Sequence, residues 1–113
     1  MAIISFAKTV DEFKAGIKSC TRRNWSEKQF RMWCKFFDEG KLIHDAYDKN
    51  PRNGGEKIGQ FKLTVRPYKE LLVHMPVSDL KAEGGMCNSM SEFCHLIGKT
   101  PLDEVTVIRF KKL

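Results

Sequence analysis

The densest group of side chains able to do chemistry lies near the N-terminus, in positions 16–23. Lys18, Arg22 and Arg23 bring three cations together, and Thr21 adds a hydroxyl between them. An arginine guanidinium grips a phosphate through two parallel hydrogen bonds, and a lysine ammonium supplies a point charge. Trp25 follows and could stack on a nucleobase, although anchoring the start of the next helix is the commoner role for such a ring. We therefore expect this segment to bind an anionic ligand.

A second basic group lies in positions 48–57. Asp, Asn, Pro and Gly dominate positions 48–55, and β-favouring runs flank them on both sides, which predicts a β-hairpin with a long tip. This tip carries Lys49, Arg52 and Lys57. The adjacent glycines Gly54 and Gly55 would let a ligand approach the backbone closely. We expect this hairpin to add a second anion-binding patch.

The cysteines and histidines do not follow a metal-binding pattern. Four cysteines are spread along the chain without a C-x-x-C pair, and the three histidines fall on separate expected elements. A zinc site needs about four convergent ligands, usually with one closely spaced pair. We expect reduced, mostly buried thiols, no metal and no cofactor. The chain also lacks a phosphate-binding P-loop and a G-x-S-x-G motif.

The totals limit the class of protein. With 113 residues, the chain has the size of one domain, which we place at residues 1–113. A hydrophobic content of 42% with 30% charged residues indicates a globular fold. The formal net charge of +6 would attract an anionic partner or simply be solvated at the surface. No apolar run has the length of a membrane span or a signal peptide. We expect a cytoplasmic protein, without membrane contact, that is a monomer.

Periodicity and capping residues predict the elements that position these groups. Alternating or β-branched runs predict strands at 3–6, 18–23, 42–47, 58–65 and 104–110, and the stretch between Pro67 and Pro76 is expected to be irregular. Amphipathic or capped segments predict helices at 10–15, 26–39 and 89–97, with one further helical turn at 78–82. Without regular βαβ alternation, this order indicates an α+β fold with a mixed sheet or barrel. Arg22 and Arg23 would lie on opposite sides of their strand, so at most one should face a cleft.

The motif Gly16-Ile17-Lys18-Ser19-Cys20-Thr21-Arg22-Arg23 resembles the G-x-K-x-x-T-x-R signature of the ASCH superfamily. The closing run Val105-Thr106-Val107-Ile108-Arg109-Phe110 is similar to the terminal strand of that family, and the order of elements between them agrees as well. The resemblance covers essentially the whole chain. It implies a PUA-like mixed β-barrel with about three flanking helices, and a cleft that binds RNA or nucleotides.

Some small bacterial ASCH-like proteins are amidohydrolases that remove the acetyl group from acetylated cytidine. The resemblance places their working set on Lys18, Thr21 and Glu83, with Thr21 as nucleophile; Glu70 and Asp79 remain alternatives for the acid. Lysine is a poor base at its usual pKa, and a carboxylate beside it would make it a worse one. Glu83 could then be the base and Lys18 could stabilise the oxyanion. A structural salt bridge is the plainer interpretation of this trio.

Three functions follow from these observations. The first is RNA or nucleotide binding through the 18–23 strand and the 49–57 hairpin. The second is an amidohydrolase acting on a modified nucleoside, which the extended basic hairpin makes less fitting. The third is a protein-interaction module that uses the apolar run Leu71, Leu72, Val73 and Met75. A ribonuclease is weaker still, because no two histidines are placed as an acid–base pair.

Overall fold

The computed structural model describes residues 2–85 and 87–113, and its central element is the last strand, β6 (Glu104–Lys112). Along one half, β6 pairs antiparallel with β2 (Cys20–Arg23) on one edge and with β5 (Tyr68–Leu71) on the other. Its far end pairs with β4 (Lys57–Leu63). The β-branched residues of β6 suit such a doubly paired position, because they pack well on a pleated surface.

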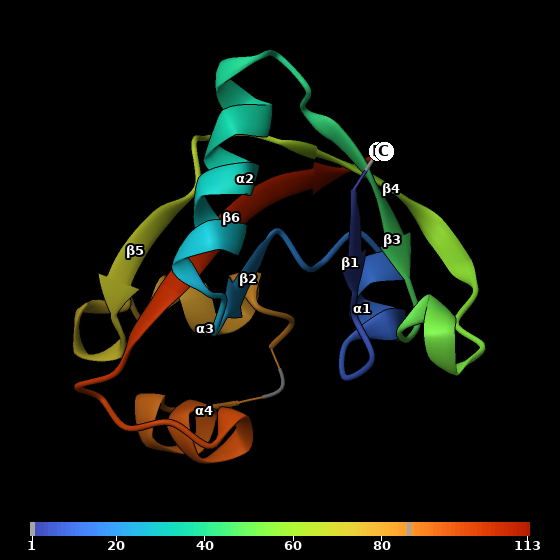
Figure 1. The fold of residues 1–113 in the computed structure, drawn as a ribbon. Helices are drawn as coiled ribbons and strands as arrows, with labels where there is room; N and C mark the ends of the chain where they lie inside the picture. The colour runs from blue at the N-terminus through green and yellow to red at the C-terminus, as the bar shows by residue number, and fades with distance from the viewer. Residues whose placement is uncertain (1, 86) are drawn as a thin grey trace.

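The sheet continues beyond β4 to the N-terminus. Strand β3 (Ile43–Tyr47) pairs antiparallel with β4, and β1 (Ile3–Ser5) pairs parallel with β3. The sheet is therefore mixed, with the order β1-β3-β4-β6-β2 and with β5 on β6. A register shift between Ala46 and Tyr47 marks a bulge near Gly59, and bulges bend a sheet locally. Figure 1 shows the result, a sheet curled into a half-barrel.

Four α-helices are present among the described residues: α1 (Val10–Lys14), α2 (Glu27–Asp38), α3 (Ser78–Ala82) and α4 (Met90–Ile97). The predicted caps of α2 and α4 are confirmed, because Ser26 accepts from the Gln29 amide and Ser89 from the Glu92 amide, both at 3.2 Å. Thr9 directly precedes α1, and its side chain makes no capping bond. None of the helices in the described part of the chain is long and apolar enough to span a membrane.

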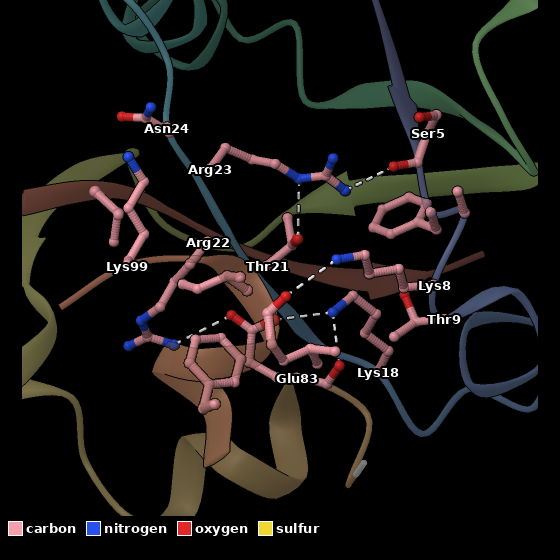
Figure 2. Close-up of a pocket in the computed structure, with 16 residues that line it drawn as sticks. Ser5, Lys8, Thr9, Lys18, Thr21, Arg22, Arg23, Asn24, Glu83 and Lys99 are labelled. Carbon is pink, nitrogen blue, oxygen red and sulfur yellow. Dashed lines mark hydrogen bonds and ion pairs between the residues drawn. The ribbon is translucent and has the colours of Figure 1, made fainter. Parts of the chain in front are cut away.

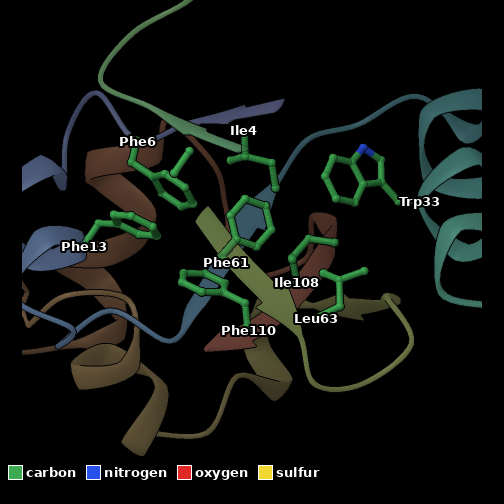
Figure 3. Packing of buried hydrophobic residues seen from close by; sticks show 9 residues of the cluster. Ile4, Phe6, Phe13, Trp33, Phe61, Leu63, Ile108 and Phe110 are labelled. Carbon is green, nitrogen blue, oxygen red and sulfur yellow. The ribbon is translucent and has the colours of Figure 1, made fainter. Parts of the chain in front are cut away.

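The main core fills the concave side of the sheet with aromatic rings (Figure 3). Trp33 of α2 is buried here as its helical spacing predicted, and Trp25 stacks on it with ring centroids 5.2 Å apart. Phe6, Phe13, Phe61 and Phe110 pack around one another next to this pair. Because Trp25 is occupied by this stacking, its ring serves the start of α2.

A smaller core lies between β6 and the short helices. Its buried residues are Leu72, Met75, Leu80, Phe93, Cys94 and Val105. This corrects one expectation, since Leu72 and Met75 of the predicted interaction patch are buried, and Val73 is the one of the four that is exposed. Leu72 and Met75 pack inward because β5 and the following 3-10 turn (Leu72–His74) cover the N-terminal half of β6.

Strand β5 was not predicted. Its residues Tyr68-Lys69-Glu70-Leu71 show little hydrophobic alternation, and the flanking prolines suggested an irregular segment. The strand forms because β6 offers it a free edge, with Tyr68 opposite Val107 and Leu71 opposite Glu104. The tertiary partner, rather than local propensity, makes this segment extended.

Candidate functional site

One pocket of about 330 Å³ brings the motif residues together (Figure 2). It lies between the loop from β1 to α1, strand β2, the end of α3 and helix α4. The polar lining is Ser5, Lys8, Thr9, Lys18, Thr21, Arg22, Arg23, Asn24, Glu83 and Lys99. The apolar lining is Phe6, Ala7, Phe93, Leu96, Ile97 and Val105. Small-molecule sites combine apolar side chains with placed polar groups, and this pocket offers both, with more polar lining residues than is usual.

Lys18 and Glu83 form a buried ion pair in this pocket. The Ser19 amide donates to the Ala82 carbonyl at 2.8 Å and so fixes the segment before β2 against the end of α3. The Lys18 Nζ then donates to Glu83 Oε2 at 2.9 Å and to the Glu83 carbonyl at 2.7 Å. Burial lowers the pKa of Lys18, and the Glu83 carboxylate opposes this shift. Among the three acids considered from the sequence, Glu83 is the one that contacts Lys18.

The other two acids bind Arg22 instead. Its Nη2 donates to Asp79 at 2.6 Å and to Glu70 at 2.8 Å, while Nη1 lies 3.4 Å from Glu83. Arg109 grips the same Asp79 with both terminal nitrogens, at 3.0 and 2.6 Å. Burial pushes the pKa of Asp79 upward, but the hydrogen bonds from Arg109 and Arg22 outweigh it, so the pKa lies below its usual value. Asp79 is therefore held ionised.

Thr21 and Arg23 face the opposite side of β2 from Arg22, as the alternation of a strand requires. Arg23 Nε donates to Thr21 Oγ1 at 3.1 Å, and its Nη2 donates to the Ser5 carbonyl at 2.7 Å. The guanidinium also lies over the Phe6 ring, 5.4 Å from its centroid. Both arginines line the pocket, contrary to expectation, because the pocket extends past the end of the strand to α3.

The basic hairpin is separate from this site. Lys49 and Arg52 are exposed at its tip, and Lys57 pairs with Asp45 at 3.1 Å. Figure 1 shows the tip beyond α1, on the other side of the molecule from α4. Gly55 approaches the carbonyl of Lys49 so closely that a Cβ there would lie 1.9 Å from that oxygen. This glycine thus serves the chain's own turn, and neither Trp25 nor the three hairpin cations line the pocket.

Several lining residues were missed in the sequence. Lys8 and Lys99 are polar residues in loops, and nothing in their spacing relates them to the motif. Asn24 directly follows Arg23 and belongs to the polar cluster that the sequence shows there, although it was not among the predicted site residues. Phe93 and Leu96 were expected on a helix, but only the fold brings that helix to the same pocket as β2.

No metal-binding group of three or more His, Cys, Asp or Glu side chains occurs within residues 2–85 and 87–113. A larger hollow of about 850 Å³ between α2 and β3 contains none of the predicted site residues. The chain matched nothing when it was compared with protein-family models, curated proteins and solved structures.

Proposed function

We propose that this chain is an ASCH-type domain with a PUA-like barrel, and that it binds a nucleobase-bearing ligand, an RNA or a nucleotide, in the pocket beside β2. The observation that supports this most is the convergence of Lys18, Thr21 and Arg23 with Glu83, which is distant in sequence, around a single hollow. Lys18, Thr21 and Arg23 belong to the G-x-K-x-x-T-x-R motif on which the resemblance to the ASCH superfamily rests, and Glu83 is the acid that this resemblance implies. The half-barrel with helices at its open side is compatible with the barrel it implies.

The pocket has the properties that a nucleobase needs. Its volume of about 330 Å³ is near the lower end of the ~300–1,000 Å³ found for small-ligand sites. The Thr21 hydroxyl, the Asn24 amide and the Glu83 carboxylate provide donors and acceptors for the edge of a base. Phe93 and Leu96 provide an apolar wall for its face. A heterocyclic base has a polar edge and an apolar face, whereas a simple anion has no apolar face.

An NMR titration of the labelled protein with ribonucleosides, their 5′-monophosphates and short oligoribonucleotides tests the proposal. We expect amide shifts in β2, at the end of α3 and in α4, and a loss of affinity of about tenfold in Thr21→Val, which removes one hydrogen-bonding group at nearly constant shape. RNA binding should weaken as salt is raised. Lys49→Ala on the hairpin is the control and should bind like the wild type. Shifts confined to the hairpin, or no shifts at all, would contradict the proposal.

A second candidate, an amidohydrolase acting on an acetylated nucleoside, is favoured by the Lys18–Glu83 pair in the same pocket as Thr21. The Thr21 oxygen would attack the acetyl carbonyl while Glu83 takes the hydroxyl proton. The amide C–N bond would break, and the nucleoside amine would leave with a proton. Water would then release acetate from the acetyl-threonine. Lys18, already charged and fixed, would stabilise the oxyanion.

Incubation with N4-acetylcytidine and measurement of released acetate tests this candidate. We expect Thr21→Ala and Lys18→Ala to stop release, and Glu83→Gln to do so if Glu83 is the base. An active Glu83→Gln variant would exclude that assignment. Circular dichroism must show that each variant is folded, because all three side chains are buried. Acetylcytidine binding without any acetate would exclude hydrolysis and leave the binding function.

A further inference from the structure

We propose that the mouth of the pocket is a phosphate site formed by Arg23, Lys8 and Lys99, so that the ligand is a phosphate ester of a nucleoside. This inference rests on the proposed function and specifies its ligand. The shared chemistry is a phosphate next to a nucleobase, which a free mononucleotide and an RNA strand both offer.

The charges of the pocket lining, together with those of the residues behind it, separate two groups of cations. The inner group is neutralised, because Lys18, Arg22 and Arg109 face the carboxylates of Glu70, Asp79 and Glu83 within ion-pair distance. The outer group is Lys8, Arg23 and Lys99, and none of these forms an ion pair within the described part of the chain. Three positive charges therefore border the mouth without a direct ion pair, although Asp103 acts electrostatically on Lys99 and Glu83 on Arg23 from a greater distance. An anionic ligand would be attracted there and would neutralise them.

The guanidinium of Arg23 is fixed in a position from which it could bind such an anion. Hydrogen bonds to Thr21 and Ser5 and the contact with the Phe6 ring fix its guanidinium from three sides. Its Nη1 makes no hydrogen bond among the described residues. Nη1 is also not a buried atom that lacks a partner, since the one such atom among the described residues is Arg22 Nε. Figure 2 shows Nη1 turned away from both partners. A fixed guanidinium with free N–H groups loses little conformational entropy when it binds a phosphate.

The two lysines come from opposite rims. Lys8 lies in the loop before α1, and its Nζ reaches across to the Leu96 carbonyl of α4 at 3.2 Å. Lys99 follows Gly98, whose left-handed backbone (φ 67°) ends α4 and reverses the chain. Figure 2 shows the side chains of Lys8 and Lys99 on either side of Arg23. A phosphate between the rims would be within the field of all three cations, while the base of the same ligand fills the pocket below.

Calorimetric titrations with the four common ribonucleosides, their 5′-monophosphates and a short oligoribonucleotide test the inference. We expect at least one nucleotide or the oligonucleotide to bind about tenfold or more tightly than its nucleoside, as charge-assisted hydrogen bonds to phosphate would give. This ratio should fall close to one in Lys8→Ala/Lys99→Ala. The matched control, Lys28→Ala/Lys35→Ala, removes the same charge from exposed positions on α2 and should keep the ratio.

The outcomes distinguish the two levels of the proposal. Equal affinity for nucleosides and nucleotides would overturn the phosphate site while the proposed function stands. The phosphate site would also be overturned if the control variant loses the preference for nucleotides as much as Lys8→Ala/Lys99→Ala does, because the effect would then be one of net charge. Binding of none of these compounds would overturn the proposed function together with the phosphate site. A preference for the oligonucleotide or for the monophosphate identifies the source of the phosphate.

Discussion

At the scale of single residues, the site is dominated by charges that the protein buries and must compensate. Glu83 receives Lys18 on one oxygen and lies near Arg22 on the other, and both cations are almost fully buried. Removing charges from water is costly, and the cost is tolerable only where each ion keeps its partners. The pair therefore contributes to stability as well as to any chemistry in the pocket.

Glu83→Gln should destabilise the protein by about 3 kcal/mol, because it leaves a buried ammonium without its counter-ion. Urea denaturation at pH 7 measures this. Glu39→Gln is the matched control: it breaks the exposed Lys41–Glu39 pair and should cost less than about 1 kcal/mol. An equal loss of unfolding free energy in the two variants would show that the buried pair contributes no more to stability than the exposed pair does.

His44 should make the stability of the protein depend on pH below about 6.5. Its Nδ1 accepts from the Ala2 amide at 3.2 Å and its Nε2 lies 2.7 Å from the Lys41 carbonyl, an arrangement that fits a neutral ring. Burial lowers the pKa of His44 from its usual 6.5, and the bond to the Lys41 carbonyl only partly opposes this. Because the folded-state pKa is the lower one, this stability is complete above pH 6.5 and is lost as the pH falls.

Denaturation of wild type and His44→Phe at pH 7, 6 and 5 tests this dependence. We expect the wild type to lose stability towards pH 5. The variant should be less stable at pH 7, because the Ala2 amide and the Lys41 carbonyl lose their partner, but its stability should change less with pH. Parallel pH profiles for the two proteins would refute the role of His44.

At the scale of elements, the β3–β4 hairpin shows a turn that the sequence located correctly and whose glycines have a role within the chain itself. The turn chemistry of 48–55 marks the tip, where a 3-10 turn (Pro51–Asn53) begins at Asn50, whose side chain accepts from the Arg52 amide at 2.9 Å. The glycines were expected to admit a ligand. Gly54 instead adopts a left-handed conformation, and Gly55 passes against the Lys49 carbonyl. Both serve the turn itself.

Gly55→Ala should therefore destabilise the hairpin by about 1–3 kcal/mol, since the added methyl group would overlap the Lys49 backbone. Gly54→Asn is the control, because asparagine tolerates the left-handed region and nothing lies within 4 Å of the added Cβ. Thermal or urea denaturation of both variants measures the difference. A similar cost for the two substitutions would contradict the close approach at Gly55.

At the scale of the whole molecule, strand β6 joins the two cores. Val105 belongs to the smaller core, whereas Ile108 and Phe110 belong to the main one. Because one continuous strand crosses both, we expect the protein to unfold in a single cooperative transition. The two tryptophans report on the main core and Cys94 on the smaller one.

Thiol labelling compared with tryptophan fluorescence along a urea gradient tests this cooperativity. Burial raises the pKa of Cys20 to about 12 and also raises those of Cys34, Cys87 and Cys94, so little thiolate is present at pH 8. Cys87 is only half-buried and should react slowly in the native protein. The three buried thiols should react at the same urea concentration at which the fluorescence changes. Earlier labelling of Cys94 would show that α4 opens separately.

The sequence by itself determined the features that depend on local chemistry. Capping residues and apolar spacing predicted α2 and α4, alternation predicted β4 and β6, and turn residues predicted the hairpin tip. The motif at 16–23 and Glu83 were also identified there, because residue type and resemblance are properties of the chain. The sequence also predicted the α+β class, because that class follows from the order of the locally predicted helices and strands.

Only the tertiary structure decided which of these groups meet. β5 is extended because β6 offers it an edge, and Glu83 rather than Glu70 or Asp79 faces Lys18 because Ser19 is bound to the end of α3. Lys8 and Lys99 reach one mouth from positions 91 residues apart because α4 lies against the loop after β1. The hairpin cations Lys49, Arg52 and Lys57 do not line this pocket. Contacts between segments so distant in sequence depend on the packing of the whole chain, and no local pattern encodes them.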